Sequence, residues 1–165
     1  MAKLKLGILG INQDSAKKLN REELSQLVKK TLEIYPLGEI LKLSAIAIGE
    51  TYATSQYLRG IREASLLQKR YNSDIIAIVE DGAHPYYDKK TGLIYSNINP
   101  LNLSHQLGHK LGLSHPKHHC EEPCSKHYAK RCKFSKEIMG CAGTIEETIG
   151  FSKSDITTLK KVYKI

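Results

Sequence analysis

Apolar residues recur first at strand spacing and then at helix spacing along the start of the chain. Residues 3–11 alternate apolar and polar side chains, which predicts a strand. Asn20 is typical of a helix N-cap, and the acidic residues after it suit a first turn. This helix is expected to run to about Tyr35, because Pro36 cannot continue it. Its apolar positions are Leu19, Leu24, Leu27, Val28 and Leu32.

Two strands and a second helix are predicted next. Residues 39–48 have strand character, residues 57–71 have helical spacing, and residues 74–80 form a third strand. The run from Ile75 to Val79 is continuously apolar, which is typical of a strand buried on both faces. The alternation of strands and helices predicts an α/β fold with a mostly parallel sheet and right-handed crossovers. The apolar positions of the strand over 39–48 are Ile40, Leu41, Leu43, Ile46 and Ile48. Those of the helix over 57–71 are Leu58, Ile61, Leu66 and Leu67.

The pattern changes after residue 82. Residues 82–88 are polar and aromatic, residues 89–92 suit a turn, and residues 93–98 suit a short strand, so an antiparallel hairpin is expected at the sheet edge. Asn99 then suits an N-cap with Pro100 in the first helical position, in a helix that ends near Leu111. A last helix is predicted over residues 153–164. Its signals are a capping box of Ser152 with Asp155 and apolar positions at Ile156, Leu159, Val162 and Tyr163.

Length and composition narrow the class of protein. The 165 residues suit a single domain, with 41% hydrophobic and 25% charged residues. No apolar run is long enough for a transmembrane helix, and the N-terminus lacks the features of a signal peptide, so we expect a cytoplasmic protein, unless a leader has been removed, with no membrane partner. The net charge of +8 is diffuse, which favours a solvated surface over a nucleic-acid partner. We expect a monomer.

Three histidines between positions 105 and 115 are the strongest chemical signal. His105 and His109 are four residues apart, so a helix places them on one face, about one turn apart. Gly112 can adopt the left-handed conformation that ends a helix, after which the chain can turn back and present His115. Three neutral imidazoles with an open fourth position suit a catalytic zinc ion.

This segment resembles the zinc-binding motif of the metzincin metallopeptidases, His-Glu-x-x-His-x-x-Gly-x-x-His. Ten of the eleven positions are compatible, and the exception is Gln106, where the family has Glu. In the family this Glu is the general base that activates the attacking water, and a carboxamide cannot accept that proton. Gln106 therefore indicates either an introduced Glu→Gln change that prevents self-digestion, which we favour because the rest of the site is intact, or a natural pseudoenzyme.

The resemblance also implies an architecture. It implies a single metzincin-like catalytic domain over residues 1–165, with a twisted, mostly parallel sheet, an antiparallel edge strand, an active-site helix and a C-terminal helix. An N-terminal subdomain would cover residues 1–112 and a C-terminal subdomain residues 113–165. Met139 corresponds to the methionine that lies in a tight turn beneath the zinc in this family. The stretch of Ala83, His84, Pro85 and Tyr86 would border a peptide substrate at the edge strand, although an ordinary surface hairpin explains it nearly as well.

Four cysteines cluster at Cys120, Cys124, Cys132 and Cys141. They could form two disulfides in an oxidising compartment or hold a structural zinc in a reducing one. Archaemetzincins carry a second, cysteine-held zinc, but with a different spacing, and we favour disulfides. His118, His119 and His127 could assist a second metal, although an exposed position suits them better.

The expected function is zinc-dependent endopeptidase chemistry on a peptide or protein substrate, with zinc as the cofactor and with hydrolysis suppressed by Gln106. Two alternatives remain open. One is a natural pseudopeptidase that binds zinc and captures peptides without cutting them. The other is a binding module for nucleic acid or protein, built on the basic Cys/His loop between Lys117 and Lys136.

Overall fold

The computed structural model describes residues 2–12, 17–49, 61–115, 138–139 and 150–165, in which a five-stranded sheet is covered on both faces. The strands are β1 (Leu4–Ile11), β2 (Leu41–Gly49), β3 (Ile75–Glu80), β4 (Tyr86–Tyr87) and β5 (Ile94–Ser96). The helices are α1 (Arg21–Leu32), α2 (Leu37–Ile40), α3 (Ile61–Arg70), α4 (Pro100–Lys110) and α6 (Lys153–Tyr163).

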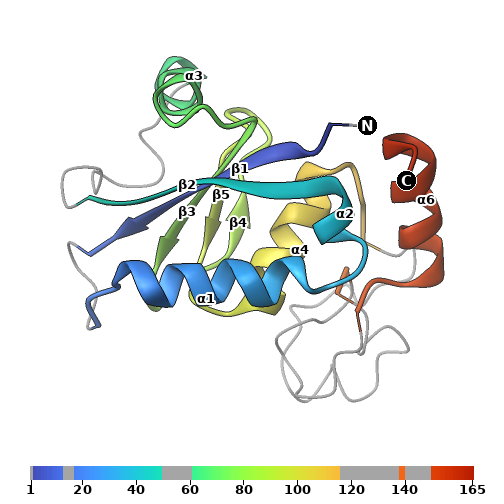
Figure 1. The fold of residues 1–165 in the computed structure, drawn as a ribbon, viewed down its shortest axis with the longest axis horizontal. Helices are drawn as coiled ribbons and strands as arrows, with labels where there is room; N and C mark the ends of the chain where they lie inside the picture. The colour runs from blue at the N-terminus through green and yellow to red at the C-terminus, as the bar shows by residue number, and fades with distance from the viewer. Residues whose placement is uncertain (1, 13–16, 50–60, 116–137, 140–149) are drawn as a thin grey trace.

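The sheet order is β2-β1-β3-β5-β4, and only the edge pair β4–β5 is antiparallel. The predicted α/β class with an antiparallel edge strand is therefore confirmed. Helices α1 and α4 lie on one side of the sheet and α3 on the other (Figure 1). The chain moves outward from β1 to β2 and then back past β1 to β3, so crossovers of one hand place α1 and α3 on opposite faces.

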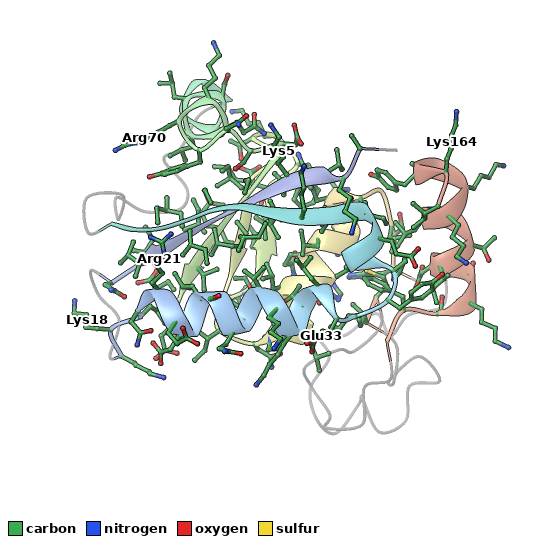
Figure 2. The ribbon with its side chains drawn as sticks, in the orientation of Figure 1. Lys5, Lys18, Arg21, Glu33, Arg70 and Lys164 are labelled. Carbon is green, nitrogen blue, oxygen red and sulfur yellow. The ribbon has the colours of Figure 1, made fainter. Side chains whose placement is uncertain are left out.

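Strand β3 is buried on both faces, as its apolar run predicts. Ile75, Ala77 and Val79 pack toward α1 and α4, whereas Ile76 and Ile78 pack toward α3. Alternate residues of a strand point to opposite faces, so an unbroken apolar run contributes side chains to the hydrophobic cores on both faces of the sheet. Charged side chains such as Lys18, Glu33 and Lys164 lie at the periphery (Figure 2).

Several element boundaries differ from the expected ones. The first helix ends at Leu32 rather than near Tyr35. Residues 37–40 form the short helix α2, so the strand predicted from residue 39 begins at Leu41. The predicted helix over 57–71 is described from residue 61 onward. Helical spacing also predicted Leu66 and Val162 on the buried faces of their helices, but each is 56% exposed. Both stand at the flank of an apolar stripe, where spacing alone does not decide burial.

The predicted N-cap at Asn20 and the predicted capping box at Ser152 are both present, and they fix where α1 and α6 begin; the Asn20 cap is also a complete capping box. The Asn20 side chain accepts a hydrogen bond from the backbone N–H of Glu23, and the Glu23 side chain accepts one from the backbone N–H of Asn20. Ser152 and Asp155 form the same pair at α6. None of the helices in the described part of the chain combines the length and apolar character needed to cross a bilayer.

Candidate metal centre

Helix α4 carries two of the three histidines, and its start is fixed by a polar network. The Asn99 side chain accepts a hydrogen bond from the backbone N–H of Leu101 at 2.8 Å, and Pro100 occupies the first turn, as predicted. The Asn97 amide oxygen accepts hydrogen bonds from the Asn99 backbone and from the Asn102 side chain. The Asn97 amide nitrogen donates to the carbonyl of Ala83. The start of α4 is therefore anchored to the loop that leads into β4.

The helix ends in a Schellman motif at Gly112. The backbone N–H of Leu113 donates to the carbonyl of Gly108 at 2.9 Å, and the N–H of Gly112 donates to the carbonyl of His109 at 3.1 Å. Gly112 has a φ of +98°, in the region that side chains disfavour, and the next residue, Leu113, is buried. The chain doubles back here, which confirms the predicted turn and brings His115 toward α4.

The three imidazoles converge on one point. Each Nε2 atom of His105, His109 and His115 lies 3.1 Å from the other two. Two nitrogens bound tetrahedrally to zinc at about 2.0–2.1 Å are about 3.3 Å apart, so the triangle has nearly the right size for one ion. His105 and His109 are half-buried and His115 is exposed, which leaves one side of the triangle open.

The backbone fixes which nitrogen of two rings can bind a metal. The carbonyl of Ile138 lies 2.6 Å from Nδ1 of His105, and the carbonyl of Leu113 lies 3.1 Å from Nδ1 of His109. A carbonyl only accepts, so each Nδ1 carries the proton and each neutral ring directs the lone pair of its Nε2 into the triangle. Lone pairs that face each other at 3.1 Å repel unless a cation lies between them.

A proton on Nε2 of His109 would also relieve the repulsion between the lone pairs, but the surroundings of His109 disfavour its protonated form. Burial lowers the pKa of His109, and the positive charge of Lys89 lowers it further, against an opposing contribution from the Leu113 carbonyl. Burial also lowers the pKa of the next residue, Lys110. The neutral imidazole, which is the metal-binding form, is therefore favoured at His109.

The turn at Ile138–Met139 lies directly beneath α4. Its backbone supplies the carbonyl that holds His105, and the Ile138 N–H donates to Gly150 ahead of α6. Met139 is fully buried, and its Sδ atom occupies the space that a Cβ at Gly108 would fill. Met139 therefore packs against α4 at Gly108, between the two helical histidines, and its predicted role as the family's methionine turn stays a prediction. The glycine in mid-helix has a packing reason, since a larger residue would collide with the sulfur.

Gln106 lies beside the triangle. At 100° per residue it stands within about 100° of both His105 and His109 around the helix axis. Its side chain is 8% exposed, and within the described residues its amide makes no hydrogen bond to protein. Every fully buried side-chain nitrogen or oxygen in those residues has a partner, so the Gln106 amide keeps contact with solvent. It is placed to hydrogen-bond a water or ligand but has no carboxylate to accept a proton.

The two adjacent tyrosines of the edge strand β4 face opposite sides of the sheet. Tyr86 pairs with Tyr95, stacks on its ring at 6.3 Å between centroids and is 45% exposed, on the α3 side of the sheet. Tyr87 packs on the α4 side, and its ring stacks near His109. Of the predicted substrate stretch, Ala83, His84 and Pro85 precede β4, and only Tyr86 belongs to it. Sequence reasoning selected Tyr86 and missed Tyr87, although strand alternation allows only one of them to face the centre.

The predictions for the cysteine cluster and the remaining loop histidines concern other residues than those the structure describes. Cys120, Cys124, Cys132, Cys141, His118, His119 and His127 all lie outside the described residues. Their predicted disulfides or second zinc stay predictions.

Comparison with known proteins gives a likeness in fold. No family model matches the sequence, and no curated protein matches it. Among solved structures, the chain is similar to archaemetzincin from Methanopyrus kandleri, with 14% sequence identity, a TM-score of 0.51, and coverage of 99% of this chain and 97% of that one. At this identity the likeness concerns the fold. The mixed sheet, edge strand and helices described above are consistent with the archaemetzincin fold.

Proposed function

We propose that this chain is a metallopeptidase-type domain that binds zinc through His105, His109 and His115 and receives a peptide beside the metal. The observation that carries the proposal is the triangle of Nε2 atoms at 3.1 Å, with the Nδ1 atoms of two of its rings committed to backbone carbonyls. The archaemetzincin likeness supports it at the level of the fold, and the metzincin-like motif supports it at the level of the site.

Each part of the site has a distinct task in this proposal. The carbonyls of Ile138 and Leu113 hold two imidazoles in the metal-binding tautomer. When bound, zinc supplies Lewis acidity that polarises a carbonyl and acidifies water. The amide of Gln106 orients that water but cannot take its proton, so the chain with Gln106 is expected to hydrolyse peptides slowly or not at all. Loss of a general base typically costs about 10²–10⁴-fold in rate.

The edge strand β4 is the proposed place for the peptide. It pairs only with β5 among the described strands, so its other edge offers backbone groups to an extended peptide. Tyr87 of this strand lies near His109, so a peptide paired there would run close to the metal. The substrate class is therefore an extended peptide or protein segment, bound through its backbone.

The test is restoration of hydrolysis by Gln106→Glu. The zinc-loaded variant should cleave members of an unstructured peptide library, and a chelator should abolish the cleavage. The double variant Gln106→Glu/His105→Ala is the matched control and should be inactive. A zinc-loaded Gln106→Glu variant that cleaves no peptide would refute the peptidase proposal.

A second candidate is a natural pseudopeptidase, favoured by the presence of Gln106 in an otherwise complete centre. It predicts zinc-dependent binding of peptides by the unchanged chain, with no hydrolysis after Gln106→Glu. Fluorescence anisotropy of labelled peptides, with and without zinc, tests the binding that both candidates expect, and hydrolysis by Gln106→Glu distinguishes them.

A further inference from the structure

Tyr87 is the aromatic residue that the edge strand directs at the metal centre. Its ring lies nearly parallel to the imidazole of His109, with an interplanar angle of 11° and a centroid separation of 6.5 Å. That is an offset stack near the long end of the usual range. The Tyr87 ring also packs on the main core, and its hydroxyl makes no hydrogen bond within the described parts of the chain. The ring, rather than the hydroxyl, is the part that meets the protein.

His109 needs such a contact more than His105 does. The Nδ1 atom of His109 is held by the Leu113 carbonyl at 3.1 Å, whereas the bond of His105 to Ile138 is 2.6 Å. Rotation of an imidazole about its last torsion is broad, and one hydrogen bond in the ring plane resists tilting only weakly. A second ring lying parallel to the first limits that tilt.

The hairpin holds Tyr87 firmly enough to act in this way. Asp88, the next residue, accepts hydrogen bonds from the backbone of Lys90 and from the hydroxyl of Thr91. Its own N–H donates to the carbonyl of Leu93, and the N–H of Gly92 donates to the carbonyl of Asp88. The turn is thus closed by four hydrogen bonds directly after Tyr87.

The same turn also lies against α4. A Cβ built on Gly92 would come within 2.8 Å of Nζ of Lys110, the residue that follows His109. Gly92 has a φ of +72°, so glycine suits the backbone conformation at this point of the turn. The hairpin therefore meets α4 at two neighbouring points, Tyr87 with His109 and Gly92 with Lys110.

We propose that Tyr87 is a positioning residue of the metal centre, whose ring fixes the orientation of His109 and thereby raises the affinity of the three histidines for a metal ion. The inference rests on the proposed function, because it assumes that the triangle binds a metal. It adds a residue from the edge strand to a centre whose ligands come from α4 and the turn after it. Outer residues that orient metal-binding histidines typically change metal affinity by about 10–100-fold when removed.

Tyr86 provides a matched control. It is the same residue type, one position away, and its stacking partner is Tyr95 on the opposite face. Tyr86→Leu and Tyr87→Leu each remove one aromatic ring from β4, so both weaken the hairpin, but only Tyr87→Leu removes the contact with His109. Tyr87→Phe keeps the ring and removes only the hydroxyl.

The experiment is a Co²⁺ titration of each variant with Gln106 left in place, followed by visible absorption and by competition with a chromophoric chelator. The difference from His105→Ala isolates the histidine centre from metal bound elsewhere. Tyr87→Leu should weaken Co²⁺ binding by about 10–100-fold and alter the visible bands, whereas Tyr87→Phe and Tyr86→Leu should stay within about threefold of the unchanged chain. Thermal unfolding of the metal-free variants measures the loss of stability separately.

The outcomes separate this inference from the proposed function. Binding by Tyr87→Leu within about threefold of the unchanged chain, or an equal loss in Tyr86→Leu, would overturn the role of Tyr87 while the metal centre stands. If the unchanged chain and His105→Ala bind Co²⁺ equally, both the centre and the inference fail. Should Tyr87→Leu not fold, Tyr87→Val keeps strand propensity without a ring and is held to the same expectation.

Discussion

The substitution Gly108→Ala tests whether helix propensity or packing beneath the metal centre decides the stability of the protein at this position. Gly108 lies inside α4 between two candidate ligands. By helix propensity alone, alanine should stabilise the protein by about 0.5–1 kcal/mol. The structure predicts the opposite sign, because the added Cβ would overlap Sδ of Met139 and lie 3.2 Å from Cε1 of Phe151.

The size of the effect follows from where that overlap falls. Met139 is fully buried, and the colliding atom is the sulfur within the side chain rather than its free end, so the turn beneath α4 has to move. Overpacking of this kind costs about 1–3 kcal/mol, and subtracting the propensity gain of about 0.5–1 kcal/mol leaves a central expectation of about 1 kcal/mol of net loss. The same turn supplies the Ile138 carbonyl that holds His105, so metal affinity should fall by about tenfold or more.

The assay is urea unfolding of the metal-free protein, combined with a Co²⁺ titration. Gly108→Ala, Met139→Ala and the double variant form a cycle. Met139→Ala should leave a cavity, and the added methyl at position 108 should then be better tolerated than in the presence of Met139. Equal or greater stability of Gly108→Ala with unchanged metal affinity would refute the packing described for this turn.

Three further changes have defined outcomes. Gly112→Ala should cost about 1–2 kcal/mol in urea unfolding because of its positive φ, and should weaken Co²⁺ binding by misdirecting His115; unchanged binding would count against the turn. Asn20→Ala removes the α1 cap and should cost about 1 kcal/mol in urea unfolding without changing Co²⁺ affinity. Burial raises the pKa of Asp88, but its hydrogen bonds from Thr91 and Lys90 outweigh this effect and lower the pKa overall. The Asp88 carboxylate therefore stabilises the folded protein at a pH above its pKa in the unfolded chain. This stabilisation is lost as the pH falls through its pKa in the folded protein. Unfolding between pH 5 and 3 should be less pH-dependent in Asp88→Asn, and identical slopes would contradict this.

The sequence predicted those features of the centre that depend on local chemistry. Asn99 and Pro100 begin α4 and Gly112 ends it, because capping is decided within a few residues. The convergence of three histidines then follows from helix geometry and one turn. The order of strands and helices was predictable for the same reason, since each apolar period marks one element.

What the sequence could not predict depends on contacts between distant segments. Residues 37–40 have strand-like apolar content but form a short helix buried against the core. Tyr86 and Tyr87 are equivalent in sequence, and only the pairing of β4 with β5 decides which one faces His109. The contact of Met139 with Gly108 joins residues 31 positions apart, and no local pattern reveals it.

Anomalous diffraction at the zinc edge from zinc-loaded crystals tests the central claim most directly. A peak should lie within bonding distance, about 2.0–2.1 Å, of the Nε2 atoms of His105, His109 and His115 together. Crystals that hold zinc elsewhere but show no peak between these three rings, or that show the ring of His115 turned away from α4, would contradict it.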